Sequence, residues 1–313
     1  MNTEKFVDYT ARIVENCGKV IIGKDEVIRQ IVVSFLSEGH VLLEDVPGTG
    51  KTMLLRAFSK SIGGDFRRIQ FTPDLLPSDL TGINFYNQKL GEFQFRKGPV
   101  FSNVVLADEI NRATPRTQSA LLEAMEEKQV TVDGETFAMA SPFIVMATQN
   151  PIESYGTFPL PDAQMDRFFM RLSMGYMERE QELSILGRRA SSQMVEELEQ
   201  VVTREETLDL IQEIPQVKVS SDVENYIMDL VEYTRKDSHL LAGVSTRGAM
   251  ALYKASQITA AMNGRDYVIP EDVKREAIPI LAHRISMGNG TTEDAVAYLE
   301  QMLNEVELPL ETV

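Results

Sequence analysis

The residues best suited to chemistry lie in a glycine-rich turn that follows an apolar stretch, in Val41-Leu-Leu-Glu-Asp-Val-Pro-Gly-Thr-Gly-Lys-Thr52. The last two glycines let successive backbone N–H groups point at one anion. Lys51 adds a positive charge, the Thr52 hydroxyl can ligate Mg²⁺, and the helix expected over 52–61 directs its positive end at the same place. The turn therefore predicts a site for the phosphates of a nucleotide.

One position departs from the general phosphate-loop pattern, G-x-x-x-x-G-K-[ST]. Asp45 stands where that pattern has its first glycine. We place Asp45 at the junction of strand and loop, outside the phosphate cradle, and therefore expect the departure to be tolerated.

Two carboxylates follow a second apolar run, Val104-Val-Leu-Ala107, which is typical of a buried strand. Phosphoryl transfer needs a carboxylate that holds Mg²⁺, and hydrolysis needs a base or a group that positions water. We assign the first role to Asp108 and the second to Glu109. Together with the glycine-rich turn, this pair predicts Mg²⁺-dependent hydrolysis of a nucleoside triphosphate.

Three further polar residues stand near the ends of expected elements. Asn150 follows a strand, and it either reaches the γ-phosphate and the attacking water or forms a simple Asn-Pro turn. Arg167 either pairs with Asp166 or projects across a subunit boundary. Arg247 lies in the first turn of a helix, where a positive charge opposes the helix dipole unless an anion is near.

Strand-like and helical patterns alternate over the first part of the chain, which predicts an α/β fold with a doubly wound parallel sheet. Residues 3–37 read as two helices. Two stretches of alternating apolar and polar residues, 82–96 and 129–139, predict β-hairpin inserts, and the second contains an Asp-Gly turn. The expected strands begin at Val41 and cover 66–71, 104–107, 143–147 and 168–172.

Strand signals end near Gly175, where we place a domain boundary. Residues 1–175 are expected to form the nucleotide-binding domain, and residues 176–313 a smaller all-helical domain. The helices expected there cover 177–190, 205–213, 221–236, 246–263, 271–284 and 292–304.

Composition limits the classes of partner. The chain of 313 residues has a formal net charge of −16, and residues 178–237 hold 15 acidic and 7 basic residues. A protein that binds nucleic acid neutralises phosphates with a basic stripe, which this sequence lacks. Nucleic acid is therefore an unlikely partner, and the acidic segment is either a solvated helical surface or a face that binds a partner.

Other features predict a cytoplasmic protein. It has one cysteine, Cys17, and three scattered histidines without metal-ligand spacing. It has no run of 18 apolar residues, so no membrane span is expected. Its first residues lack the pattern of a secretory signal.

The motifs together resemble the MoxR family of AAA+ ATPases, over about residues 18–285. The segments that carry the resemblance are Asp45-Val-Pro-Gly-Thr-Gly-Lys-Thr52, Ile69-Gln-Phe-Thr-Pro-Asp-Leu-Leu-Pro-Ser-Asp-Leu-Thr-Gly82, Leu106-Ala-Asp-Glu-Ile-Asn-Arg-Ala113, Ala147-Thr-Gln-Asn-Pro151, Ala163-Gln-Met-Asp-Arg-Phe168 and Val244-Ser-Thr-Arg-Gly248. The resemblance implies an αβα sandwich around a five-stranded parallel sheet, a helical lid domain and ATPase activity.

The resemblance also implies a role for each matching residue. Glu109 would activate water, Asn150 would be sensor 1, Arg167 the arginine finger and Arg247 sensor 2, while Arg112 and Arg116 remain alternatives for the finger. The residues implied to bind ATP are Ile22, Gly23, Pro47, Gly48, Thr49, Gly50, Lys51, Thr52, Met53, Asp108 and Arg247, with Thr52 and Asp108 also holding Mg²⁺.

In this family the finger acts on a neighbouring subunit, which implies a homo-oligomeric ring, typically of six copies. The resemblance further implies a chaperone-like factor that remodels client protein complexes, with a VWA-domain protein as partner. Two alternatives stay open. One is a nucleic-acid motor resembling the MCM or McrB branches, although the second hairpin carries acidic residues at its tip. The other is the ATPase subunit of a magnesium-chelatase-type complex.

Overall fold

The first part of the chain folds around a parallel sheet of five strands, in the order β2-β5-β8-β1-β9. The computed structural model describes residues 1–45, 48–149, 156–186, 191–288 and 291–309, and no side chain in the range 184–192. The sheet confirms the predicted α/β class. Its strands are β1 Val41–Glu44, β2 Phe66–Gln70, β5 Val104–Asp108, β8 Ile144–Gln149 and β9 Met170–Leu172.

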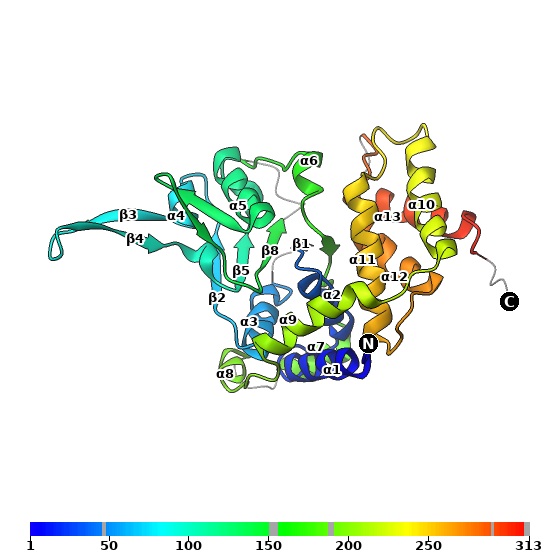
Figure 1. Cartoon of the computed structure of the whole chain (residues 1–313), viewed down its shortest axis with the longest axis horizontal. Coiled ribbons are helices and arrows are strands. Elements are labelled where there is room, and N and C mark those ends of the chain that lie inside the picture. The colour runs from blue at the N-terminus through cyan, green and yellow to red at the C-terminus, as the bar shows by residue number, and fades with distance from the viewer. Residues whose placement is uncertain (46–47, 150–155, 187–190, 289–290, 310–313) are drawn as a thin grey trace.

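Helices cover both faces of this sheet, because alternate side chains of each strand point to opposite sides. On β1, Val41 and Leu43 join one apolar core and Leu42 joins the other. The first core includes residues of α1 Glu4–Gly18, α2 Asp25–Leu36 and α3 Lys51–Ser61, and the second those of α4 Pro77–Thr81 and α5 Pro115–Glu127. Figure 1 shows the resulting layers.

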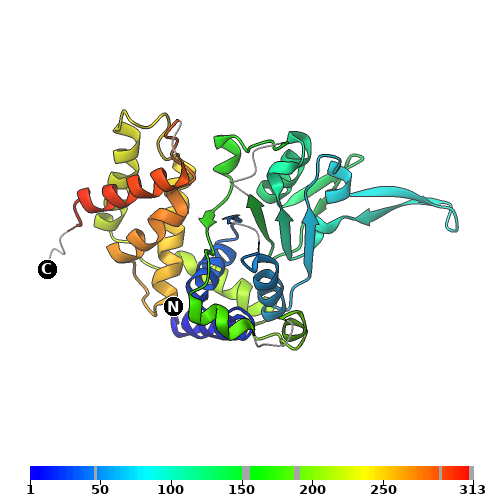
Figure 2. The ribbon, with the colours of Figure 1, turned by 180° about the vertical axis from the view of Figure 1, so that it is seen from behind.

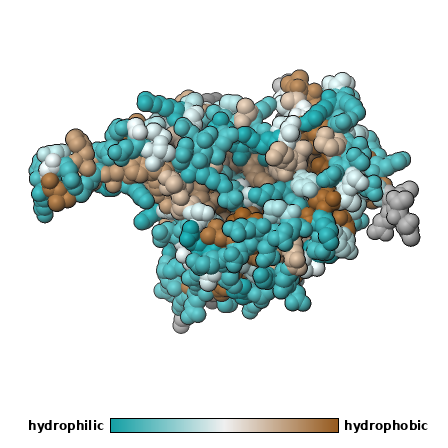
Figure 3. Space-filling model, viewed as in Figure 1, coloured by the Kyte–Doolittle hydropathy of each residue, from teal (hydrophilic) through white to brown (hydrophobic). Residues whose placement is uncertain are grey.

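Both predicted hairpins are present. One consists of β3 Gly82–Asn87 and β4 Glu92–Lys97, and the other of β6 Gln129–Val132 and β7 Glu135–Ala138. Phe95 of the first stacks on Phe137 of the second, with ring centroids 4.2 Å apart. The first hairpin projects far from the body (Figure 1), and its tip carries apolar side chains (Figure 3), with Phe93 73% exposed and Leu90 61% exposed.

The rest of the described chain after β9 is helical, as predicted. Its α-helices are α7 Arg179–Leu186, α8 Ser191–Glu196, α9 Arg204–Glu213, α10 Ser221–Lys236, α11 Thr246–Met262, α12 Pro270–Leu281 and α13 Thr292–Glu305. Short helices elsewhere are η1 Pro99–Phe101, η2 Ile110–Arg112, α6 Asp162–Met165 and η3 Ile214–Gln216. Helices α10 to α13 lie together on the side of the molecule away from the β3–β4 hairpin, as Figure 2 also shows.

Helices α7 to α9 lie beside α1 and α3 rather than with α10 to α13 (Figure 1). The Arg12 guanidinium on α1 binds the Glu206 carboxylate on α9 at 2.9 Å, and the backbone N–H of Val201 donates to the carbonyl of Ser61 on α3 at 2.9 Å. The boundary near Gly175 therefore stays a prediction. Over the described residues, each helix is too short or too polar to cross a membrane.

Candidate functional site

The predicted phosphate turn and the two carboxylates line one cavity of about 380 Å³, a size typical of small-molecule sites. The cavity lies at the carboxyl ends of the parallel strands, where such sheets bind ligands. It is lined by Asp45, Gly48, Thr49, Gly50, Lys51, Thr52, Met53, Arg68, Gln70, Asp108, Glu109, Thr148 and Gln149.

The glycines of the turn have backbone conformations that L side chains rarely adopt. Gly48 has φ +89° and Gly50 has φ +90°. Helix α3 begins directly after Gly50, so its free N–H groups face the cavity, as an anion site requires. The ammonium of Lys51 donates to the backbone carbonyl of Asp45 at 3.0 Å. The lysine is thus held at the mouth of the turn.

Asp45 has a structural role that the sequence did not reveal. Its side chain is buried, and its carboxylate accepts hydrogen bonds from the Ser173 hydroxyl at 2.8 Å and from the backbone N–H groups of Met174 at 2.6 Å and Gly175 at 3.0 Å. This carboxylate ties the end of β1 to the segment after β9. Asp45, the residue that departs from the general pattern, therefore stabilises the contact between these two segments. It also lines the cavity, whereas we expected it to lie outside the phosphate cradle.

Asp108 is held on both sides. Its Oδ1 accepts from the Thr148 hydroxyl at 2.6 Å, and its Oδ2 accepts from Nε and Nη2 of Arg68 at 3.1 and 2.6 Å. Arg68 and Thr148 lie on β2 and β8, the two strands that pair with β5 in parallel. A positive charge thus already lies beside the carboxylate predicted to hold Mg²⁺.

Glu109 begins the turn after β5 in a left-handed conformation, with φ 57°. Such a conformation costs a residue other than glycine about 1–3 kcal/mol, and it is common at functional sites. The backbone N–H of Glu109 donates to the Thr148 hydroxyl at 2.8 Å. Its carboxylate accepts from the Gln70 amide at 2.8 Å and pairs with the Arg112 guanidinium at 3.1 Å. Strand ends thus direct Glu109 toward the cavity.

The cavity suits a polar ligand and a cation. Among the described residues, the buried Thr49 hydroxyl and the buried Gln149 amide nitrogen have no hydrogen-bond partner within the protein, and both residues line the cavity. Buried polar groups of this kind call for a partner. The Thr52 hydroxyl and the Asp108 carboxylate both line the cavity and offer the hard oxygen atoms that fit Mg²⁺.

Arg167 and Arg247 lie outside this cavity. Arg167 binds Oε2 of Glu126 at 3.2 Å, and Arg247 binds Oε1 of the same carboxylate. Glu126 lies near the end of α5, and its carboxylate contacts both the loop before β9 and the first turn of α11. Arg247 is not among the residues that line the cavity, and its role in binding ATP stays a prediction.

The other predicted residues are placed as follows. Asn150 and Pro47 lie outside the described residues. Ile22 and Gly23 do not line the cavity; the adjacent Lys24 donates to the backbone carbonyls of Met174 and Tyr176, so this turn packs on the segment that Asp45 fastens. Of the alternative finger residues, Arg112 contacts Glu109 of its own chain, and Arg116 is exposed on the first turn of α5.

Sequence reasoning missed four residues of the cavity: Arg68, Gln70, Thr148 and Gln149. For two of them, Gln70 and Thr148, the sequence held a usable signal. Gln70 is the last residue but one of a predicted strand and Thr148 follows another, and the carboxyl ends of parallel strands meet at one edge. Only the register shows the match, since Gln70 pairs with Asp108 across β2 and β5.

A glycine-rich turn between a parallel strand and a helix, with a carboxylate pair at the end of β5, one strand beyond β8 in the same sheet, defines a phosphate-loop nucleotide-binding protein. Comparison with known proteins narrows the class. Residues 40–170 match the family model "ATPase family associated with various cellular activities (AAA)", and residues 232–301 match the model "AAA lid domain".

Similar proteins cover nearly the whole chain. It is 48% identical to the uncharacterized protein YeaC of Bacillus subtilis, over 96% of this chain and 95% of that one. It is 39% identical to Chaperone MoxR1 of Mycobacterium tuberculosis, over 95% of this chain and 82% of that one. A solved structure of a candidate ATPase from Cytophaga hutchinsonii has a TM-score of 0.89 and 41% identity, over 97% of each chain. The chain belongs to the MoxR family of AAA+ ATPases.

Proposed function

We propose that this protein hydrolyses ATP in the Lys51 cavity with Mg²⁺, and that a neighbouring copy supplies the arginines that complete the site. One observation carries the proposal. Lys51, Asp108 and Glu109 line a single cavity, whereas Arg167 and Arg247 lie together elsewhere on the same chain. We propose that one copy supplies the binding half of the site and that its arginine pair, held by Glu126 of the same chain, is presented to another copy.

The residues of the cavity divide the chemistry among them. The backbone N–H groups of the turn and the Lys51 ammonium would bind the β- and γ-phosphates, and Thr52 and Asp108 would hold Mg²⁺, which neutralises phosphate charge when bound. Glu109 would take the proton of the attacking water. Gln70 and Arg112 both bind Oε2 of Glu109, so the proton would be transferred to Oε1 without either contact having to open.

Arginines from a neighbour would stabilise the charge that develops on the transferred phosphoryl group, and such a finger contributes about 10³–10⁵-fold in related systems. We propose a closed ring, with six copies as the expected number. ATP hydrolysis per copy should then fall on dilution as rings dissociate. Constant activity per copy over a wide dilution series, with dissociation confirmed by mass photometry, would contradict the ring.

The biological role that we propose is remodelling of client protein complexes in the cytoplasm, with a VWA-domain protein as partner. The name of the relative MoxR1, a chaperone, supports this class of role. The β3–β4 hairpin offers a contact surface for clients, since its apolar tip is exposed (Figure 3).

Clients should be captured on the Glu109→Gln protein, which should bind ATP without hydrolysing it. Phe93→Ser on the same background should release those that dock on the hairpin. Hydrolysis stimulated by DNA would instead favour a nucleic-acid motor, and a requirement for a porphyrin-binding partner would favour a metal-insertion complex.

A further inference from the structure

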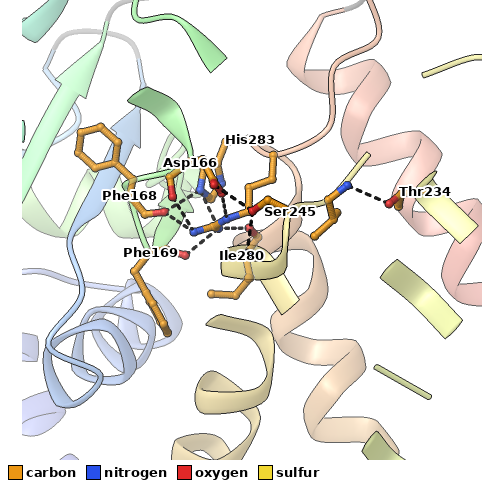
Figure 4. Close-up of polar contacts among 10 residues, drawn as sticks. Asp166, Phe168, Phe169, Thr234, Ser245, Ile280 and His283 are labelled. Atoms are coloured by element: carbon orange, nitrogen blue, oxygen red, sulfur yellow. Dashed lines mark hydrogen bonds and ion pairs between the residues drawn. The ribbon is translucent and has the colours of Figure 1, made fainter. Parts of the chain in front are cut away.

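A buried ion pair joins the loop that carries Arg167 to the helices that carry Arg247. The Arg284 guanidinium donates from Nε to Oδ1 of Asp166 at 2.8 Å, and the Ser245 hydroxyl donates to Oδ2 of the same carboxylate at 2.9 Å. Figure 4 shows Asp166 and Ser245 within this cluster of polar contacts. Asp166 directly precedes Arg167, and Ser245 stands two residues before Arg247.

Arg284 fixes this joint through further bonds. Its side chain is 2% exposed, and it donates to the backbone carbonyls of Phe168 at 2.6 Å and Phe169 at 3.0 Å, as well as to that of Ile280. The guanidinium therefore spans three segments: the loop before β9, the end of α12 and, through Asp166, the start of α11. Such a planar fork matches several acceptors at once, which a lysine cannot do.

The start of α11 is fixed by the same contacts. Ser245 is the N-cap of α11, and its hydroxyl accepts from the Gly248 backbone N–H at 3.2 Å. A Cβ added at Gly248 would lie 2.8 Å from Cδ of Arg284, so the helix start packs directly on the guanidinium stem. The backbone positions of both arginines are thus set by one cluster, while their side chains meet at Glu126.

We propose that Asp166 and Arg284 are positioning residues that hold Arg167 and Arg247 at a fixed spacing, as one anion-binding pair for the γ-phosphate bound by a neighbouring copy. This inference rests on the proposed function. Two flexible cationic side chains on separate segments would otherwise have to be ordered together when the nucleotide arrives, and a misplacement of about 1 Å can cost roughly 10²-fold in rate. Glu126 acts as the stand-in anion until the phosphate replaces it.

A mixing experiment isolates this role from all others. The acceptor chain carries Arg167→Ala and Arg247→Ala with Glu109 intact, so it hydrolyses only if a neighbour supplies arginines. The donor chain carries Glu109→Gln with both arginines intact, so it cannot hydrolyse in its own cavity. Mixed rings of the two should regain hydrolysis, measured as phosphate release, and all of that activity reports how well the donor presents its arginines.

The donor is then varied. Asp166→Asn keeps the size of the side chain and removes the charge that Arg284 binds. Added to the donor, it should lower the recovered rate roughly 10- to 100-fold while the donor's affinity for a fluorescent ATP analogue stays unchanged. Ser245→Ala, a milder second variant, should lower the rate less and serves if the first variant fails to fold.

Matched controls separate positioning from loss of stability. Asp272→Asn weakens another buried aspartate–arginine pair, with Arg265, at distances of 2.6 Å. Ser220→Ala removes a helix N-cap on α10 without touching Asp166. Neither should lower the recovered rate when placed in the donor.

The outcomes are distinct. No recovery with the plain donor would show that the proposed function in trans is wrong, and the positioning role with it. If the recovered hydrolysis rate is the same with Asp166→Asn or Ser245→Ala in the donor, the proposed function in trans stands but the positioning role is wrong. Equal losses from the control variants, or loss of ring assembly by mass photometry, would show a merely structural role and also overturn it.

Discussion

The phosphate cavity and the arginine pair come from the same chain but are assembled in opposite ways. The cavity collects residues at the ends of adjacent parallel strands, where the sheet itself sets their positions. The arginine pair joins a loop, a helix start and a helix end, and Arg247 and Glu126 stand 121 residues apart in the sequence. The two regions therefore separate the cavity proposed to bind ATP and activate water from the arginines proposed to stabilise the transferred phosphoryl group.

The largest effect should come from removing the arginine pair. Arg167→Ala combined with Arg247→Ala should lower kcat about 10³–10⁵-fold, because the charge on the transferred phosphoryl group loses its stabilisation. The Kd of an ATP analogue for the isolated copy should not change, because neither side chain lines the cavity. Stopped-flow binding measures the Kd of the ATP analogue, and steady-state hydrolysis measures kcat. A large loss of affinity for the ATP analogue in the isolated copy would show that the arginine pair also belongs to the binding site of its own chain.

Glu109→Gln should lower hydrolysis about 10²–10⁴-fold, the usual contribution of a general base. ATP affinity should persist, since the amide keeps the hydrogen bond geometry around Gln70. Single-turnover hydrolysis measures the loss. Unchanged turnover would show that another group activates the water.

A substitution at Asp45 tests how much its carboxylate stabilises the segment after β9 beside the cavity. Asp45→Gly restores the general pattern but leaves the N–H groups of Met174 and Gly175 without their acceptor. Urea denaturation should show a loss of about 1–3 kcal/mol, the cost of leaving a buried donor unpaired. Ser173→Ala, which removes only one donor to the same carboxylate, should cost less. If Asp45→Gly were neutral, the carboxylate would have no fastening role.

The smallest effect concerns the joint between α2 and the lid helices. Glu276 on α12 is fully buried, and burial raises its pKa to about 7. It accepts from the Gln30 amide on α2 at 3.2 Å and from the Thr259 hydroxyl on α11 at 2.8 Å. Charged groups near it are Glu26 and Arg29 on α2 and Arg275 on α12.

Because its folded-state pKa is raised, Glu276 contributes stability that is fully present below its unfolded pKa and is lost as pH rises through about 7. Thermal unfolding from pH 5 to pH 8 should show this loss, and Glu276→Gln should flatten it. The affinity of the cavity for ATP at one fixed pH should not change, because Glu276 lies outside it. An identical pH profile for both proteins would contradict the assignment.

The parts of the site that could be read from the sequence are those tied to local structure. Lys51 and Thr52 follow a glycine turn, and Asp108 and Glu109 follow an apolar run, so their local motifs were enough to predict them as parts of one site. Gln70 was missed because its role depends on the register of β2 against β5. Asp45 was underestimated because its partners lie 128 to 130 residues away, past the last strand.

Strand periodicity and turn chemistry act over a few residues, so the strands, the two hairpins and the nucleotide-binding motifs could be predicted from the chain alone. The positions of the arginines depend on tertiary packing. Their pairing with Glu126 and the bond between Arg284 and Asp166, residues 118 apart, depend on how whole helices pack. Such packing is set by many weak contacts between residues far apart in the sequence, and a local sequence motif does not contain this information.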